Sequence, residues 1–366
     1  MKLHSILKNI ALLIALVIIS LSGCRKKPYD ETSEGVNLLI DSDMVESFDD
    51  GIAFMMLLGT DNIHIMGLTT TTTNVWAQEG LSYGIRIGEL CGGNDVTYIA
   101  GKGLPLREGR LDSINREIDA NPGKDADWRG AVSYPIVEDW ESFYHTRYGR
   151  QPVIRASSLD ASEYIADRVM SNPGKITILA IGACTNIAKA LMAHPQMASM
   201  AREIVYMGGA VNCPGNTTPY AELNFLYDPE AAAICLRAPF PKQTLVSLDV
   251  CNTVIMDKAR FMSVYDAIRS EDIRSMIRGN FPFPDFQENP SSIQYIWDLV
   301  SAAIVINPHI ITEYKDIRID IDDSPGSPAY GRSFETDDES CQIIRVPSSI
   351  DQARFWDILI SAISKF

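Results

Sequence analysis

Short apolar runs alternate with segments of helical periodicity over most of the chain. The apolar runs predict strands at Leu38–Ile40, Ile63–Thr69, Val96–Ile99, Ile176–Ile181, Glu203–Met207 and Thr244–Leu248. A helix is predicted after each strand, at 49–58, 76–91, 160–171, 185–193, 228–238 and 257–269. Repeated strand-helix units form parallel sheets, and their ligands bind at the carboxyl ends of the strands. We therefore predict an α/β, Rossmann-like fold with a largely parallel central sheet and helices on both faces.

Two long stretches interrupt this alternation. Residues 101–156 are rich in Gly, Arg and aromatic side chains, and residues 270–296 carry Phe281, Phe283 and Phe286. Loops of this length inside a compact domain are usually lids or binding elements. We expect them to cover a ligand site, and an added surface subdomain is the alternative.

The amino-terminal residues have the pattern of a secretion signal. Lys2 and Lys8 precede an uncharged apolar run, 10–21, that is too short to span a bilayer. The sequence Leu21-Ser22-Gly23-Cys24 then resembles the lipobox of bacterial lipoproteins. We predict a signal peptide at 1–23, a lipidated Cys24, a polar tether at 24–35 and a folded domain at 36–366. This predicts a lipid anchor in the bacterial cell envelope, periplasmic or surface-exposed, and an uncleaved anchor helix is the alternative.

Charge excludes one class of partner. The protein has 366 residues and a formal net charge of −15, which becomes −17 without residues 1–23 because two lysines and no acids are removed. Such an acidic chain repels nucleic acid. The remaining length is enough for one large domain or two small ones. The cysteines beyond Cys24 show no CxxC spacing, and several lie in apolar contexts typical of buried side chains, although an oxidising compartment permits disulfides.

The stretch LLIDSDMVESFDDGIAFMMLL, residues 38–58, carries the strongest chemical signal. Asp41 and Asp43 end the first predicted strand, and Asp49 and Asp50 open the next helix. Four carboxylates at this edge of a sheet need a cation, and an all-oxygen ligand set suits Ca²⁺ or Mg²⁺ better than zinc. The alternative is a solvated acidic turn that caps the helix.

Polar residues follow the other predicted strands. Asn74 lies after the second strand, Ile181-Gly182-Ala183-Cys184-Thr185-Asn186 ends the fourth, and Met207-Gly208-Gly209 ends the fifth and leads on to Asn216, Glu222 and Asn224. Amides and a carboxylate at one sheet edge suit a polyhydroxylated ligand. Each residue alone is an ordinary turn residue.

Together these motifs resemble the inosine-uridine-preferring nucleoside hydrolase family. The family's Asp-x-Asp and following Asp pair are Asp41-Ser42-Asp43 and Asp49-Asp50, and its strand-four motif is residues 181–188. Its later motifs match Met207-Gly208-Gly209, Glu222-Leu223-Asn224, Asp228-Pro229-Glu230-Ala231 and Asp298. The resemblance covers roughly residues 37–100 and 157–366, nearly all of the chain except the signal, the tether and 101–156.

The resemblance implies calcium-dependent hydrolysis of the N-glycosidic bond of ribonucleosides to ribose and free base. It implies one Ca²⁺ bound by Asp43, Asp50, Asp298 and the backbone carbonyl of Ile181, with Asp41 supporting the ligands. Asp49 is implied as the general base. The ribose contacts implied by the matching positions are Asn74, Met207, Asn216, Glu222 and Asn224. The family also often forms dimers or tetramers, which predicts a homo-oligomer.

The chain departs from the family at the leaving group. The family commonly has His before the last metal Asp, where this chain has Trp297. Trp cannot deliver a proton but can stack on a planar base. We therefore predict an aromatic pocket made by Trp297 with one or more of Trp128, Tyr144, Phe281 and Phe283. His145 is the candidate substitute acid, and Glu46 in the longer loop 44–48 is expected to add an acid near the metal.

Two other functions compete with this one. A ribose- or nucleoside-binding lipoprotein would keep the metal and the sugar pocket without catalysis, which the missing His permits. A haloacid dehalogenase-like phosphatase also begins with a strand and Asp-x-Asp. It needs a downstream Lys and a second acidic motif at a later strand, whereas here the acidic pair follows at once.

Overall fold

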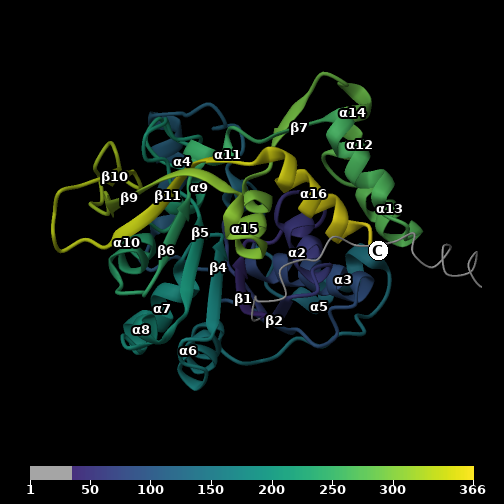
Figure 1. Cartoon of the computed structure of the whole chain (residues 1–366), viewed down its shortest axis with the longest axis horizontal. Coiled ribbons are helices and arrows are strands. Elements are labelled where there is room, and N and C mark those ends of the chain that lie inside the picture. The colour runs from purple at the N-terminus through teal and green to yellow at the C-terminus, as the bar shows by residue number, and fades with distance from the viewer. Residues whose placement is uncertain (1–34) are drawn as a thin grey trace, which may run out of the picture. The chain divides into compact units, whose positions relative to one another are not determined.

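A nine-stranded sheet lies at the centre of residues 35–366, the part of the chain that the computed structural model describes (Figure 1). Its strand order is β10-β9-β11-β6-β5-β4-β1-β2-β3. The strands are β1 (Val36–Ser42), β2 (Ile63–Thr70), β3 (Thr97–Ala100), β4 (Ile176–Ile181), β5 (Glu203–Met207), β6 (Gln243–Val246), β9 (Ile311–Ile321), β10 (Ser333–Glu335) and β11 (Ile343–Ile350). Strands β1 to β6 run parallel, β11 joins β6 in parallel, and β9 and β10 add antiparallel pairs. The predicted α/β fold with a largely parallel sheet is confirmed.

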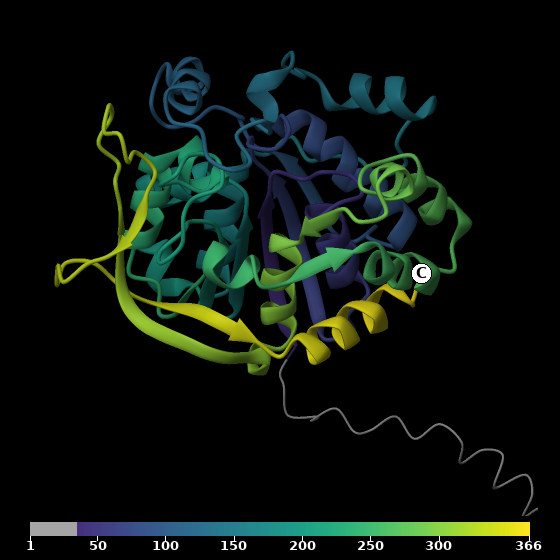
Figure 2. The ribbon, with the colours of Figure 1, turned by 90° about the horizontal axis from the view of Figure 1, so that it is seen from above.

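Helices cover both faces of the sheet, as Figure 2 shows. One face packs against α2 (Asp50–Leu58), α3 (Ala77–Cys91), α15 (Trp297–Ile306) and α16 (Gln352–Ile363). The other packs against α6 (Ala161–Ser171), α7 (Thr185–Ala193), α8 (Met197–Met200) and α10 (Pro229–Arg237). In β1, Leu38 and Ile40 enter the first core and Leu39 the second, because successive side chains of a strand point to opposite faces.

The predicted elements differ from the observed ones mainly at their ends. The predicted strand 244–248 ends at Val246, and Leu248 instead begins the short helix α11 (Leu248–Cys251). Ser247 donates its hydroxyl to Asp249 Oδ2 at 2.8 Å, a local bond of the kind that favours a turn or helix start over a strand.

The two stretches that interrupt the predicted alternation contain helices and a short strand, and are not long loops throughout. The first contains α4 (Arg110–Ala120), the 3₁₀ helix η1 (Gly130–Ser133) and α5 (Trp140–Tyr148). The second contains α13 (Glu271–Arg278), α14 (Phe283–Glu288) and β8 (Ile293–Tyr295). Strand β8 pairs with β7 (Ile255–Asp257), which leads into α12 (Lys258–Ala267).

The predicted signal peptide, Cys24 and the tether up to residue 34 lie outside the described residues. Within residues 35–366, no helix is both long and apolar enough to cross a membrane. The six cysteines of this part are free, and all but Cys213 are buried, as their apolar contexts predicted.

Candidate active site

The first acidic motif lies at the carboxyl end of β1. Asp41 is buried, and its Oδ1 accepts hydrogen bonds from Thr69 Oγ1 at 2.6 Å and Asn186 Nδ2 at 2.8 Å. Asp43 follows the strand, and its Oδ2 accepts a bond from the backbone N–H of Asn74 at 2.7 Å. Thr69 of β2, Asn186 of α7 and the loop after β2 therefore hold both side chains at the sheet edge.

Asp43, Asp50 and Asp298 come together although they are distant in sequence. Each is almost fully buried. Burial and then repulsion from Asp43 and Asp49 raise the pKa of Asp50 well above its ordinary value. Burial and repulsion from Asp49, Asp50 and Asp43 likewise raise the pKa of Asp298. Carboxyl groups repel in this way only when they are close and share a poorly solvated site.

Three buried carboxylate oxygens of this cluster have no hydrogen-bond partner: Asp41 Oδ2, Asp43 Oδ1 and Asp50 Oδ2. Buried polar atoms are nearly always paired with protein, water or an ion, so these unpaired oxygens fit a site for a bound cation. Within residues 35–366, no three His, Cys, Asp or Glu side chains already stand in a metal-coordinating arrangement. The donor set itself, carboxylates at a sheet edge, fits a hard divalent cation.

Ile181 reaches the same place through the register of the sheet. It is the last residue of β4 and pairs with Ser42, the residue before Asp43. A side chain on Gly182 would meet the backbone nitrogen of Asp43 at 2.7 Å. The strand end therefore packs directly against the acidic turn, and only glycine permits this close approach.

Asp49 connects the acidic turn to α15. Its Oδ2 accepts from the backbone N–H of Trp297 at 3.1 Å, and its Oδ1 accepts from that of Asp298 at 2.9 Å. Its φ is positive, at 33°, and its ψ is −92°, a backbone conformation that few non-glycine residues adopt. Burial raises the pKa of Asp49 to about 8. Two accepted bonds leave acceptor sites free, because a carboxylate has about four.

The predicted sugar contacts fall into two groups, of which the first is built around Glu222. Glu222 begins α9 (Leu223–Tyr227), and its carboxylate accepts from the backbone N–H groups of Gly209 at 2.9 Å and Asn224 at 2.8 Å. Burial raises the pKa of Glu222 to about 7, and the charge of Asp43 contributes to this shift. Asn224 Nδ2 donates to the carbonyl of Met207 at 3.3 Å. Glu222, Asn224 and Met207 thus form one buried group beside the acidic cluster.

The second group is held by the 101–156 stretch. Asn74 Oδ1 accepts from Trp128 Nε1 at 2.7 Å, and its carbonyl accepts from the Tyr134 hydroxyl at 2.8 Å. The carbonyl of Asn216, a buried residue, accepts from the backbone N–H of Asp125 at 2.9 Å. The sequence did not predict the contacts of Tyr134 and Asp125, because nothing in a stretch without periodicity indicates which residues face the site.

The predicted aromatic pocket needs correction. Trp297 stacks on Tyr295, with ring centroids 5.9 Å apart and an interplanar angle of 20°, and this partner was not predicted. Tyr144 is fully buried and donates its hydroxyl to Glu89 at 2.6 Å, so its role is structural. Phe283 packs against Phe261 and Tyr265 of α12, because its helix needs a core of its own.

Phe281 and Trp128 remain exposed, at 48% and 52%. Phe281 makes an edge contact with Phe48, and Trp128 lies against Asn74. Trp128 is therefore the member of the predicted set that contacts a predicted sugar-binding residue.

Glu46 does not add a free acid to the carboxyl cluster. Its Oε2 accepts from Arg147 Nη2 at 2.5 Å and from Asn280 Nδ2 at 3.1 Å, and its Oε1 accepts from the Tyr148 hydroxyl at 2.6 Å. Its charge is compensated by this ion pair. His145 is exposed on the same helix as Arg147.

The chain is similar to proteins of one known family. The model of the inosine-uridine preferring nucleoside hydrolase family matches residues 38–357. Uridine nucleosidase 1 of Arabidopsis thaliana is 34% identical over 284 residues, 76% of each chain. The pyrimidine-specific ribonucleoside hydrolase RihB of Shigella flexneri is 28% identical over 291 residues, 78% of this chain and 83% of the relative.

Solved structures share the fold. The purine-preferring ribonucleoside hydrolase from Gardnerella vaginalis has a TM-score of 0.71 at 21% identity, over 90% of this chain and 98% of that one. The inosine-uridine preferring nucleoside hydrolase from Bacillus anthracis has a TM-score of 0.68 at 21% identity, over 90% of this chain and 100% of that one. The match along residues 38–357 shows that the chain belongs to the inosine-uridine preferring nucleoside hydrolase family and is a hydrolase of N-glycosidic bonds.

Proposed function

We propose that the protein hydrolyses the N-glycosidic bond of ribonucleosides to ribose and free base in a calcium-dependent reaction. The observation that carries the proposal is the buried carboxyl cluster with three unpaired oxygens at the sheet edge. The names of two relatives, a uridine nucleosidase and a pyrimidine-specific ribonucleoside hydrolase, support a nucleoside substrate. Membership of the family does not favour the phosphatase or the non-catalytic binding protein.

In this proposal the metal ligands are Asp43, Asp50, Asp298 and the carbonyl of Ile181. The raised pKa values of Asp50 and Asp298 fit this assignment, because a cation would stabilise their charged forms. When bound, Ca²⁺ supplies positive charge that favours deprotonation of water and holds the sugar hydroxyls. Magnesium prefers a stricter octahedron and keeps more of its own waters, so we name calcium.

The chain's own residues orient the sugar and remove a proton. Asp49 takes a proton from the attacking water, and its bonds to α15 hold its carboxylate in one orientation. The ribose contacts are Asn74, Met207, Asn216, Glu222 and Asn224. Trp297 stacks on the base. This division leaves the sugar fixed by hydrogen bonds while the C1′–N bond breaks through an oxocarbenium-like state.

The proposal is tested by measuring base release from uridine, cytidine, inosine and adenosine with and without a chelator. We expect release that stops with chelator and returns with Ca²⁺. Absence of base release from all four nucleosides by the Ca²⁺-loaded protein would refute the function. Return of activity with Mg²⁺ but not with Ca²⁺ would refute the choice of metal.

Asparagine variants separate the two roles in the acidic pair. Asp49→Asn keeps an acceptor for the α15 amides and tolerates the positive φ, so we expect intact folding and retained Ca²⁺ binding. Turnover should fall by about 100-fold or more, since a general base contributes about 10²–10⁴. Asp50→Asn should lose Ca²⁺ binding, measured by calorimetry. Asp160→Asn is the matched control, because Asp160 caps the start of α6 and is not part of the acidic cluster. Full activity of Asp49→Asn would contradict its role as base.

We also propose that the protein is anchored to a membrane of the bacterial cell envelope through lipid on Cys24. The support is the lipobox-like sequence Leu21-Ser22-Gly23-Cys24 after the apolar run. Incorporation of labelled fatty acid into the full chain, lost in Cys24→Ala, would support the anchor. A homo-oligomer stays a prediction, to be measured by light scattering.

A further inference from the structure

Residues 123–128 of the 101–156 stretch connect the two loops that carry predicted sugar contacts. Asp125 donates its backbone N–H to the carbonyl of Asn216 at 2.9 Å. Trp128 donates its indole N–H to Asn74 Oδ1 at 2.7 Å. These two bonds fix the segment beside the proposed sugar site. Lys124 directly precedes the first of these two anchoring residues.

Lys124 extends toward the proposed base pocket. Its Nζ lies 4.3 Å from the centroid of the Tyr295 ring, which is a cation-π distance. Tyr295 in turn stacks on Trp297, the residue before the proposed metal ligand Asp298. The ammonium therefore lies against Tyr295, the stacking partner of the residue that is proposed to receive the base.

The ammonium is available to a ligand. The lysine side chain is 44% exposed, and its ion pair with Asp125 is loose, with Nζ and Oδ2 4.0 Å apart. An ammonium has three N–H donors, of which a ring contact and one long ion pair leave most unused. Burial and the charge of Asp249 raise the pKa of the Cys213 thiol, in the loop after β5. The charge of Lys124 is close enough to oppose part of this rise.

We propose that Lys124 is the residue that activates the leaving base, a role that rests on the proposed function above. Departure of a base needs a proton or a positive charge, because the electron pair of the C1′–N bond moves onto it. Trp297 has no proton to give, and His145 is exposed on α5, whose neighbouring side chains Arg147 and Tyr148 contact Glu46. Lys124 is the cation that the structure places at the aromatic pair.

The reaction breaks the C1′–N bond, forms a C1′–O bond and transfers two protons. The C1′–N bond breaks and its electron pair passes to the base, which receives a proton from Lys124 Nζ. The oxygen of water forms the new bond to C1′, and one proton of that water passes to Asp49. Solvent returns a proton to the amine and removes the one on Asp49. Bases that carry the departing charge on a carbonyl oxygen, such as uracil and hypoxanthine, are the leaving groups that an ammonium favours.

Leaving-group dependence tests this role. Lys124→Met keeps most of the side-chain length and removes the donors. We compare its turnover of uridine and inosine with its turnover of 4-nitrophenyl β-D-riboside, whose aglycone leaves without a proton. We expect a loss of about 100-fold or more on the nucleosides, the scale of a general acid, and less than about threefold on the nitrophenyl riboside. Addition of a primary amine such as ethylamine should partly restore uridine hydrolysis by Lys124→Ala.

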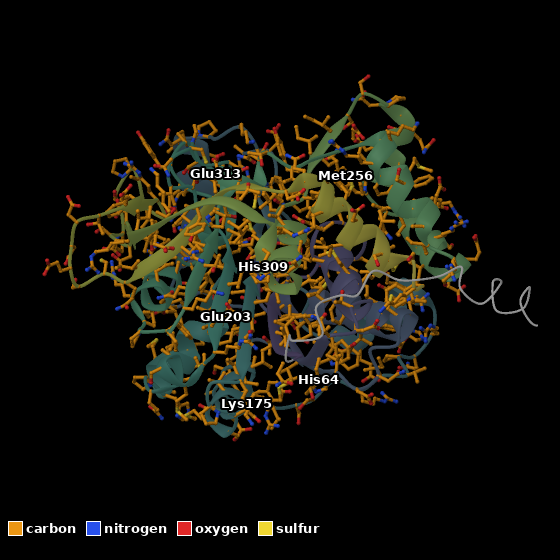
Figure 3. The ribbon with its side chains drawn as sticks, in the orientation of Figure 1. His64, Lys175, Glu203, Met256, His309 and Glu313 are labelled. Carbon is orange, nitrogen blue, oxygen red and sulfur yellow. The ribbon has the colours of Figure 1, made fainter. Side chains whose placement is uncertain are left out.

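Lys175→Met is the matched control, since Lys175 is exposed and precedes the amino end of β4, whereas the proposed site lies at the carboxyl ends of the strands (Figure 3). It should leave both rates unchanged. If Lys124→Met loses activity equally on nucleosides and on the nitrophenyl riboside, Lys124 only orders Tyr295. If its nucleoside rates are unchanged, Lys124 has no role in catalysis. Either result overturns the proposal. If the wild type fails on nucleosides, the proposed function itself is overturned.

Discussion

Arg147→Met tests how strongly the 101–156 stretch stabilises the loop of the acidic motif. Glu46, whose side chain is 4% exposed, accepts from Arg147 Nε at 3.1 Å and from its Nη2 at 2.5 Å. Arg147 also donates to Asn280 Oδ1 at 2.7 Å. Removing one partner of a buried ion pair costs about 3–5 kcal/mol, because the other charge is left uncompensated.

The expected cost is smaller here, for two reasons. Arg147 is 34% exposed, so solvent already screens part of the pair. Glu46 also keeps its hydrogen bonds from Asn280 and from Tyr148. We expect a loss of about 2–3 kcal/mol in the free energy of unfolding, which corresponds to a fall of about 3–4 °C in Tm for a domain of this size.

Thermal and urea unfolding measure the effect. The control is Arg155→Met, which removes a pair with Glu141 whose side chains are 67% and 42% exposed, so it should cost less than about 1 kcal/mol. Glu46→Gln added to Arg147→Met should recover about 1 kcal/mol, because a neutral amide needs no counter-charge. Equal shifts for Arg147→Met and Arg155→Met would refute the reasoning, since they would show that Glu46 is as well solvated as a surface acid.

Three further changes test the pocket, the sugar contact and a helix cap. Trp297→Ala should weaken purine nucleosides more than ribosides with a small aglycone, and an equal loss in kcat/KM would show a structural role. Trp128→Phe removes the hydrogen bond to Asn74 and should raise KM roughly threefold to tenfold for every riboside, about 1 kcal/mol, whatever the base. Hydrogen bonding by Ser162 lowers the pKa of Asp160 to about 2, so its contribution to stability is present above about pH 4 and lost as pH falls toward 2. Asp160→Asn should remove this part of the acid sensitivity, measured by urea unfolding between about pH 2 and 6.

The sequence predicted the strands that form continuous apolar runs and missed the strands that do not. Strand β4 is buried along its whole length, and its run of apolar residues is unmistakable. Strand β9 has exposed residues from Thr312 to Asp316, so neither the alternating nor the continuous apolar pattern of a strand is present there. Strand β9 was therefore missed. Strand β10 has only three residues, and β11 contains Pro347, which argues against a strand, so these two were missed as well.

For the site as well, the sequence could indicate residues of a local motif but not contacts between distant segments. Asp43 and Asp50 belong to a local motif at a strand end, so the sequence alone is enough to name them as candidates. Glu46 belongs to the same motif, but its partner Arg147 is 101 residues away, and no local pattern predicts that ion pair. Tyr144 was placed in the pocket because, in sequence, an aromatic residue of a long insertion looks the same whether it binds a ligand or fills a core. Its hydrogen bond to Glu89 shows that Tyr144 belongs to the core.

The two adjacent acids Asp49 and Asp50 show why a short motif can organise a whole site. Asp50 faces the carboxyl cluster, while Asp49 accepts the first backbone N–H groups of α15, 248 and 249 residues further along the chain. Those groups have no partner within the helix, and the positive end of the helix dipole favours a carboxylate there. The contact places Asp298, the second residue of α15, beside Asp50. The pair therefore fixes both the cluster and the helix that completes it, so any change that displaces the Asp49 side chain should also move Asp298.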